Sequence, residues 1–402
     1  MGRCLLGFCE EREEKVVCSL SDAKHTSNNL SEKVNIIIVG GGPAGLATAA
    51  ALVKAEPSLR DDILILEREQ HPRHKLCGGG LTPWVDELLA ELELSAPVHD
   101  FRIERVKFYL EDKPLEFDTP GILRTIRRNE FDAALAADVK RKGIRIMENS
   151  PVKNVVATPE GIVVQTAYAD FLTKVVVGAD GAKSLVRRTF FPDAVSRVSR
   201  LIEVLTPAQN GQSQEFDTRT AVFDFRLVRQ GLQGYVWDFP CWVNKQPYLN
   251  IGVFDSHVWE QPDAPRANLP SVLRDHLIAR GCEERLEISG HPERWFHATD
   301  AYSRPRVLLV GDAAGIEPWL GEGISTALAY GPIAARSILH ALRSGDFSFE
   351  DYKPRLTSSR LGKFLRRNRL LARLFYDRRF YSLLPLFGRI LQSYLKMKKK
   401  EF

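Results

Sequence analysis

The sequence of 402 residues lacks the signatures of several protein classes. Its six cysteines include no C-x-x-C pair, so neither a disulfide framework nor a cysteine-based metal site is indicated, and we predict no metal site. With 28 Gly and 22 Pro, the chain has no collagen-like or low-complexity composition. Its 44% hydrophobic and 27% charged residues are typical of a folded protein with two or three structural units.

A targeting signal is also absent. The first 33 residues contain Glu10, Glu11, Glu13 and Glu14, where a targeting peptide would be basic or poor in acidic residues. We interpret residues 1–33 as a disordered leader. The protein is therefore expected to be cytoplasmic, with peripheral attachment to a membrane left open.

One uncharged run, Ile36–Val53, has the 18-residue length at which a membrane span becomes a candidate. Its middle is Gly40-Gly41-Gly42-Pro43, preceded by a β-branched stretch and followed by an alanine-rich stretch. This order predicts a buried strand, a glycine turn and a helix rather than one membrane helix. We therefore expect no transmembrane segment.

Positive charge is concentrated at the C-terminus. The formal net charge is +5, and residues 360–402 carry thirteen Lys or Arg against Asp377 and Glu401, a net of +11, which leaves −6 for residues 1–359. Residues 351–402 are predicted to form basic helices, which either lie on an anionic membrane surface or dock on the protein with a charged outer face. Nucleic acid is not expected as a partner, because no recognition module accompanies the charge.

A dinucleotide-binding motif follows the predicted strand Val34–Val39. The next residues read G-x-G-x-x-G and open a predicted helix that ends near Lys54. Gly40 permits the tight turn, Gly42 allows the backbone to approach a pyrophosphate, and Gly45 allows the helix to pack closely on the strand. The pyrophosphate would lie at the helix N-terminus. The cofactor-binding candidates here are Gly40, Gly42, Pro43, Ala44 and Gly45.

A second predicted strand, Ile63–Leu66, ends in Glu67. A carboxylate at this position can accept hydrogen bonds from both ribose hydroxyls of a dinucleotide. The next residue, Arg68, is a further cofactor-binding candidate. The order of strand, turn, helix, strand and acid makes the motif far more specific than the glycines alone.

Two later segments favour a particular dinucleotide. Val175–Gly178 precedes Asp180-Gly181, and Val307–Val310 precedes Gly311-Asp312. With these segments the chain resembles the flavoprotein superfamily built like p-hydroxybenzoate hydroxylase, and the resemblance implies FAD. It implies that Asp312 contacts the ribityl chain and that a following helix points its dipole at the flavin ring.

The same resemblance implies further cofactor-binding residues. The helix start that follows Asp312 is supplied by Gly321, Gly323 and Ile324. Arg128 matches the basic residue that begins a flavin-contacting helix, with Arg127 as the competing assignment.

Two more motifs resemble the geranylgeranyl reductase family. They are His74-Lys75-Leu76-Cys77-Gly78-Gly79 and Gly234-Tyr235-Val236-Trp237-Asp238-Phe239-Pro240, matching K-x-C-G-G and Y-x-W-x-F-P. The resemblance implies reduction of prenyl double bonds. The chain departs from the family at Cys241, where Lys or Arg is usual, and at Pro318-Trp319-Leu320, where P-x-T is common.

These residues fit a hydrophobic substrate. Tyr235 and Trp237, spaced i and i+2, project from one face of a strand and could form either a π-lined wall or simple core. Cys77 is a candidate proton donor or redox-active thiol, and a buried inert thiol is the alternative. Lys75 and Gly78 are assigned to cofactor binding, although an exposed loop lysine is an equal alternative for Lys75.

The predicted fold class is α/β, with a discontinuous Rossmann-like FAD-binding domain, an inserted α+β sheet substrate domain and a C-terminal helical segment. The FAD-binding domain is assigned to residues 34–192 and 296–350, and the substrate domain to residues 193–295. Residues 101–118 are a candidate addition to the substrate sheet.

The leading prediction is an FAD-dependent oxidoreductase that reduces carbon–carbon double bonds of a geranylgeranyl-type isoprenoid by hydride transfer from flavin N5. NAD(P)H or a small electron carrier would act as the electron donor. Two alternatives stay open. One is an FAD-dependent monooxygenase or halogenase that uses O₂, although the chain has no W-x-W-x-I-P segment. The other is a flavin-retaining, membrane-associated binding protein without turnover.

Overall fold

The computed structural model describes residues 30–208, 213–259, 266–282 and 288–377, with single positions between 379 and 388. Most of the predicted leader and the end of the predicted basic segment lie outside the described residues. Strand β1 (Leu30–Val39) begins four residues before the predicted start of the FAD-binding domain, so residues 30–33 belong to the sheet and not to a leader. The sequence analysis did not assign residues 30–33 to a strand, because they have no apolar pattern. Backbone pairing with β11 (Asp170–Gly178) extends the strand to include them.

The first sheet has eight strands and a mostly parallel centre. Its order is β17 (Ser303–Arg304), β18 (Val307–Leu309), β11, β1, β2 (Ile63–Leu66) and β8 (Arg145–Met147), and β10 (Gly161–Thr166) joins β11 to β9 (Val152–Thr158). Parallel strands that are covered on both faces are apolar throughout, which explains the completely buried Ile-Leu-Ile-Leu of β2.

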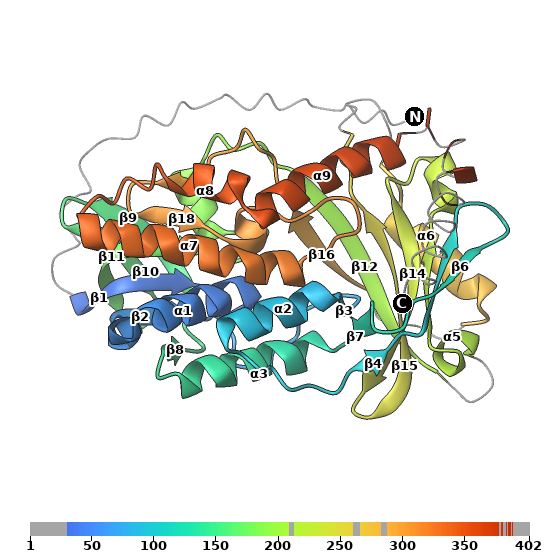
Figure 1. The fold of residues 1–402 in the computed structure, drawn as a ribbon, viewed down its shortest axis with the longest axis horizontal. Coiled ribbons are helices and arrows are strands. Elements are labelled where there is room, and N and C mark those ends of the chain that lie inside the picture. Colours follow the sequence, from blue (N-terminus) through green and yellow to red (C-terminus); the bar gives the residue numbers. More distant parts are fainter. Residues whose placement is uncertain are drawn as a thin grey trace, which may run out of the picture.

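Helices α1 (Pro43–Ala55), α3 (Arg128–Arg141) and α4 (Leu185–Phe190) contact strands of this sheet (Figure 1). On α1 pack α2 (Pro83–Leu92) and α7 (Ile324–Ser344), and α8 (Tyr352–Ser358) packs on α7. The 3₁₀ turns η1 (Pro57–Asp62) and η3 (Gly311–Ala313) also contact α1. The α1 and α7 helices approach very closely, because a Cβ atom placed on Gly331 would lie 2.6 Å from the backbone carbon of Ala47.

The second sheet has seven strands and lies at the right of Figure 1. Its order is β16 (Ser289–Arg294), β12 (Val198–Pro207), β15 (Gln246–Asp255), β14 (Gly234–Val243), β13 (Thr220–Asp224), β5 (Arg105–Tyr109) and β6 (Leu115–Asp118). One face packs on α6 (Leu269–Ala279), and the other faces the loops at the end of the first sheet. Residues 101–118 therefore contribute β5 and β6 to this sheet.

The remaining elements are a small sheet and several helices beside the second sheet. A small sheet is formed by β3 (Gly80–Leu81), β7 (Arg124–Thr125) and β4 (Phe101–Arg102), and α5 (Gln214–Asp217) and η2 (Arg226–Gln230) flank β13. Helix α9 (Arg360–Phe375) runs along the top of Figure 1 and reaches over the second sheet. The mixed α/β fold class predicted from the sequence is confirmed.

The predicted strand and helix within Ile36–Val53 are β1 and α1. Among the residues that the structure describes, no helix combines the length and the apolar character needed to span a bilayer.

The α1–α7 contact generates a stability prediction. Gly331→Ala should lower the free energy of unfolding by about 1–3 kcal/mol, because the added methyl group overlaps the backbone of Ala47. Arg336→Ala, at an exposed position of the same helix, is the control and should change stability by less than about 0.5 kcal/mol. Thermal unfolding of both variants tests this, and equal midpoints would contradict it.

Candidate active site

The turn between β1 and α1 has the shape of a phosphate cradle. Gly40 has φ +111°, and a Cβ atom on Gly45 would lie 2.1 Å from the Gly40 carbonyl oxygen. Gly42 caps α1 and Pro43 occupies its first turn. A Cβ atom on Gly42 would meet only the Arg73 guanidinium, at 3.4 Å, so the space before the helix N-terminus can admit a pyrophosphate.

Glu67 lies beside this turn, at the end of β2. Its buried carboxylate accepts hydrogen bonds from the Gly41 N–H at 2.7 Å and from the Glu69 N–H at 3.0 Å. These bonds fix the carboxylate where a ribose would follow the pyrophosphate.

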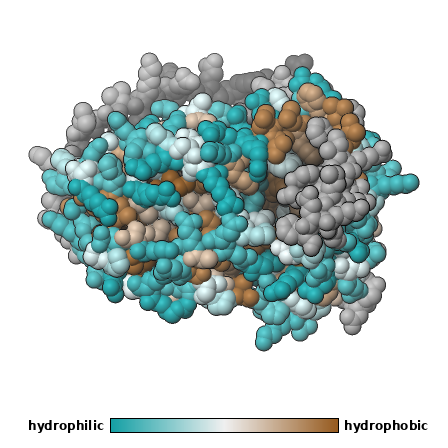
Figure 2. Space-filling view, in the orientation of Figure 1, coloured by the Kyte–Doolittle hydropathy of each residue, from teal (hydrophilic) through white to brown (hydrophobic). Residues whose placement is uncertain are grey.

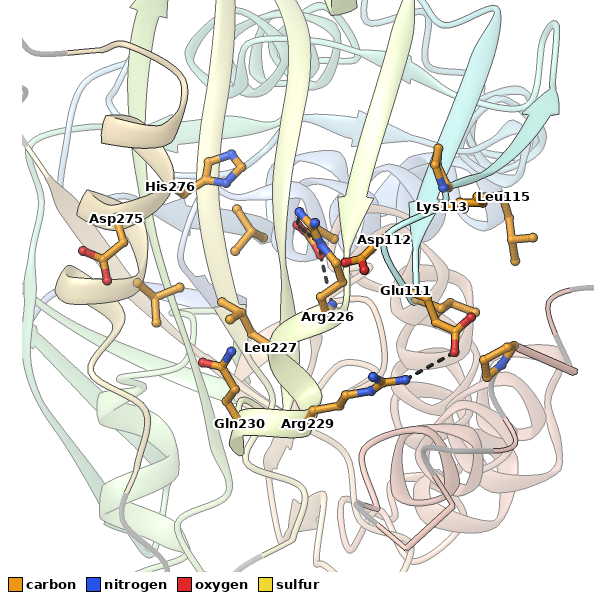
Figure 3. Close-up of a pocket in the computed structure, with 16 residues that line it drawn as sticks. Glu111, Asp112, Lys113, Leu115, Arg226, Leu227, Arg229, Gln230, Asp275 and His276 are labelled. Atoms are coloured by element: carbon orange, nitrogen blue, oxygen red, sulfur yellow. Dashed lines mark hydrogen bonds and ion pairs between the residues drawn. The ribbon is translucent and has the colours of Figure 1, made fainter.

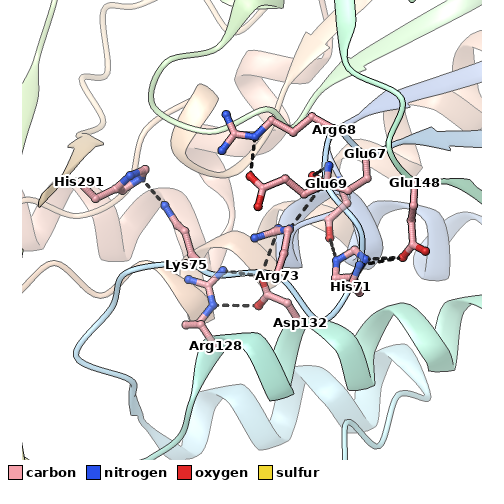
Figure 4. A network of polar contacts seen from close by, with 11 residues as sticks. Glu67, Arg68, Glu69, His71, Arg73, Lys75, Arg128, Asp132, Glu148 and His291 are labelled. Atoms are coloured by element: carbon pink, nitrogen blue, oxygen red, sulfur yellow. Dashed lines mark hydrogen bonds and ion pairs between the residues drawn. The ribbon is translucent and has the colours of Figure 1, made fainter. Parts of the chain in front are cut away.

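The Arg68 side chain is exposed, whereas Arg73 lies close to the glycine turn. The Arg68 side chain is 75% exposed and donates to Glu69 at 2.9 Å (Figure 4). Arg73, which the sequence analysis did not select, lies with Nη2 3.2 Å from Asp132 Oδ2 and Nε 3.6 Å from Glu67 Oε2. No motif marks Arg73, although it precedes the K-x-C-G-G loop by two residues.

Arg128 is the first residue of α3 and is buried. Its Nε and Nη2 atoms donate to the two Asp132 carboxylate oxygens at 2.8 and 2.9 Å. Burial disfavours the charged guanidinium, but this ion pair outweighs it and raises the pKa of Arg128 above its ordinary value. The competing candidate, Arg127, precedes the helix and is also buried.

The G-D motif lies next to the N-terminal part of the following helix, α7. Asp312 lies in η3, directly after β18. Gly321 has φ +70°, and α7 begins at Ile324 with Gly323 as its N-cap, as the sequence predicts. The dipole of this 21-residue helix places partial positive charge before Ile324.

The loop that carries K-x-C-G-G reaches from β2 to the second sheet. The Nζ atom of Lys75 contacts Nε2 of His291 on β16 (Figure 4). Burial, reinforced by the Lys75 charge, lowers the pKa of His291 to about 3, so the imidazole is a neutral acceptor. Burial also lowers the pKa of Lys75, although the nearby Asp312 opposes the shift.

Cys77 is held by its backbone. Its N–H donates to Glu203 Oε1 at 3.1 Å, its carbonyl accepts from Asn250 Nδ2 at 3.4 Å, and its sulfur accepts from the Gly79 N–H at 3.3 Å. Burial raises the pKa values of Cys77 and of Glu203. Cys77 is therefore a neutral thiol rather than a thiolate near neutral pH.

Tyr235 and Trp237 lie on the same face of β14, with ring centroids 6.1 Å apart, and Phe239 continues the row 6.2 Å from Trp237. The Tyr235 hydroxyl donates to the Leu320 carbonyl at 2.6 Å, and Trp237 Nε1 donates to Asn250 Oδ1 at 2.8 Å. Their polar atoms are thus engaged, and the remaining ring surface is apolar.

Four polar residues on this sheet face were missed by the sequence analysis: Asn250, Glu203, His291 and Glu293. Asn250 lies on β15, Glu203 on β12 and the other two on β16. Burial raises the pKa of Glu293 to about 8. The spacing of His291 and Glu293, two residues apart on a strand, was the only available signal, and it did not reveal which sheet face they share.

A separate cavity of about 890 Å³ lies elsewhere, beside η2 and α6 (Figure 3). Its charges are largely paired: Arg229 lies 3.3 Å from Glu111, and Arg226 pairs with Asp224. No motif residue except Val236 lines this cavity. Across the described residues, no group of three or more His, Cys, Asp or Glu is placed to hold a metal ion.

The open glycine turn, the buried Glu67 carboxylate and the Arg128 and Asp312 charges fit the pyrophosphate, ribose and flavin parts of FAD. Together with the fold they define an FAD-dependent oxidoreductase.

The chain belongs to the FAD binding domain family, whose model matches residues 33–348. It is 25% identical over 362 residues to digeranylgeranylglycerophospholipid reductase 2 of Methanosphaera stadtmanae, covering 82% of this chain and 84% of that protein. It is 28% identical over 330 residues to geranylgeranyl diphosphate reductase of Rhodobacter capsulatus, covering 78% and 77%.

Among solved structures, a geranylgeranyl bacteriochlorophyll reductase-like protein of Thermoplasma acidophilum has a TM-score of 0.71 at 21% identity, covering 86% of this chain and 88% of that one. The predicted resemblance to geranylgeranyl reductases is confirmed by these relatives.

The position of Glu67 generates a binding prediction. Glu67→Gln should weaken FAD binding by about 10- to 100-fold, because a hydrogen bond to a charged group contributes about 1.5–3 kcal/mol. Glu69→Gln is the matched control, since that side chain pairs with the exposed Arg68. Titration of the apoprotein followed by flavin fluorescence measures both affinities. A Glu67→Gln affinity equal to that of the control would exclude the assigned role.

Proposed function

We propose that the protein reduces carbon–carbon double bonds of a hydrophobic prenyl substrate. The observation that carries this proposal is the contact between the Cys77-Gly78 backbone and the aromatic face of β14. A Cβ atom on Gly78 would lie 3.2 Å from the Phe239 ring and 3.3 Å from Trp237 Nε1. A neutral acid and a wall of aromatic rings therefore adjoin the position expected for the flavin.

An isolated double bond needs a hydride at one carbon and a proton at the other, with positive charge developing between them. FAD, when bound and reduced, supplies the hydride. Trp237 and Tyr235 supply π-faces that stabilise the developing cation, because the ring quadrupole attracts positive charge. Their polar atoms are already engaged in hydrogen bonds within the protein.

Cys77 supplies the proton in this proposal. Its raised pKa keeps the sulfur protonated, and donation to carbon leaves a thiolate that recovers its proton from solvent before the next turnover. The hydride carries two electrons to the substrate, so the reaction consumes one two-electron equivalent and two hydrogens per double bond. The electron donor in this proposal is NAD(P)H or a small electron carrier.

Cys77→Ser tests the assignment directly. This variant should retain FAD but reduce geranylgeranyl diphosphate about 10²- to 10⁴-fold more slowly, because a serine hydroxyl is a much weaker acid. Cys282→Ser is the matched control, because that partly buried thiol packs in the cluster under α6.

The measurement is anaerobic. The dithionite-reduced protein is mixed with geranylgeranyl diphosphate, and recovery of the oxidised flavin spectrum is followed together with a mass gain in two-hydrogen steps. Reoxidation only after air is admitted would refute reduction of this substrate and favour oxygen chemistry. No reoxidation in either condition would favour a binding protein without turnover.

Helix α9 has exposed apolar residues that could bring the protein to a membrane containing a prenyl substrate. It buries Leu361, Leu365 and Ala372 against the protein but leaves Leu370 59% and Leu374 46% exposed. Figure 2 shows hydrophobic surface near the end of this helix, beside hydrophilic side chains. We propose that this mixed basic and apolar face rests on an anionic membrane surface.

Replacing both Leu370 and Leu374 with Ser should reduce co-sedimentation with phosphatidylglycerol vesicles by at least about tenfold, because two apolar side chains no longer enter the bilayer interface. Ile278→Ser, which changes a 62% exposed residue on α6, is the control and should bind vesicles like the unmodified protein. Equal sedimentation of all three proteins would contradict the membrane contact.

A further inference from the structure

Glu293 is an acid with a buried carboxyl oxygen, and the proposed reduction assigns it no role. It lies on β16, two residues after His291, so both side chains share the sheet face that the Lys75 loop covers. A Cβ atom on Gly321 would lie 3.1 Å from Glu293 Oε2, so the carboxyl group reaches the loop before α7. In the part of the chain that the structure describes, this oxygen is buried without a hydrogen-bond partner.

Several charged groups face Glu293 from different elements. Asp312 comes from η3, Glu317 from the loop that follows it, Lys75 from the loop after β2 and Arg128 from α3. Burial is the largest influence, Asp312 and Glu317 oppose ionisation, and Lys75 and Arg128 favour it. The resulting pKa of about 8 keeps Glu293 protonated at neutral pH.

Asp312, Gly321 and the start of α7 are the same features that the sequence assigns to the flavin. A negative charge added to a flavin in this position would disfavour a carboxylate at Glu293. By linkage, the proton affinity of Glu293 must then depend on the oxidation state of the flavin.

We propose that Glu293 is a protonation site linked to flavin reduction. When a two-electron donor reduces the flavin, the flavin takes up two electrons and one proton, and an ionised Glu293 takes up a second proton from solvent. Reoxidation of the flavin releases that proton. The site thus adds one proton to the reduction step above the pH at which Glu293 ionises in the oxidised protein.

This inference rests on FAD binding and not on the prenyl substrate proposed above. It is therefore tested without any substrate. The midpoint potential of the bound flavin is measured by spectroelectrochemistry between about pH 6.5 and 9.5 in the unmodified protein and in Glu293→Gln, which retains a neutral side chain.

The two potentials should coincide below about pH 7, where Glu293 is protonated in both oxidation states. Above about pH 8 the unmodified protein should show the steeper pH dependence, with close to one additional proton taken up per flavin reduced, and the lower potential. Parallel pH dependences across the whole range would overturn the proposal.

Glu203→Gln is the matched control. Glu203 also has a carboxyl oxygen, Oε2, that is buried without a hydrogen-bond partner among the described residues, but its Oε1 accepts the Cys77 N–H. This variant should keep the unmodified pH dependence, and loss of the additional proton here instead would assign the linkage to Glu203 and refute Glu293.

Glu293→Gln must also retain FAD for the comparison to hold, which its flavin absorbance reports. If it does not, redox-difference infrared spectra of the Glu203→Gln protein at about pH 9 replace it. A protonated carboxyl band that appears on reduction is expected, and its absence would overturn the proposal.

Discussion

The site depends on the close packing of the loop from Lys75 to Gly79 between Ile126 and the second sheet. A Cβ atom on Gly79, which has φ +78°, would lie 2.1 Å from the Ile126 carbonyl oxygen, and one on Gly78 would touch the Trp237 and Phe239 rings. Side chains at these positions would push the loop off the sheet. With glycine there, Lys75 reaches His291 and Cys77 reaches Glu203.

This packing removes several ionisable groups from water, and their environments then decide which of them carry charge. Arg128 stays charged because Asp132 binds it in a bidentate ion pair. Burial favours the neutral forms of Cys77 and Glu293, because it outweighs the nearby charges of Arg128 and, for Glu293, Lys75. The protein thus has a charged group, Arg128, on the flavin side of the site and neutral acids, Cys77 and Glu293, beside the second sheet. An ion pair in the first case and burial in the second account for this difference.

The sequence predicted the local backbone structure around the candidate site. The turn from β1 to α1, the carboxylate at the end of β2 and the start of α7 are each determined by residues close together in the chain, whose spacing is itself the signal. The shared face of Tyr235 and Trp237 followed from strand periodicity alone.

What could not be predicted depends on pairing between distant segments. Glu203 and His291 reach the Cys77 loop only because β12 pairs with β16 on one side and with β15 on the other. A one-residue change of register would turn both side chains to the α6 face. The position of Arg73 beside Glu67 and Asp132 likewise depends on how the chain bends after β2, which no local pattern records.

Helix α9 and the residue that follows it form hydrogen bonds with the loop before α7. The Glu317 carboxylate accepts N–H groups of Trp319, Leu320 and Glu322 at 2.7–2.9 Å, and Asn368 of α9 donates to the same carboxylate at 3.2 Å. Tyr376, directly after α9, donates to the Trp319 carbonyl.

The loop that departs from the geranylgeranyl reductase pattern is therefore clamped between its own buried carboxylate and the C-terminal helix. The Leu320 carbonyl in turn accepts the Tyr235 hydroxyl. Hydrogen bonds thus connect α9, through Glu317 and Leu320, to Tyr235 of the aromatic wall. Helix α9 and the Pro318-Trp319-Leu320 segment therefore form one hydrogen-bonded unit.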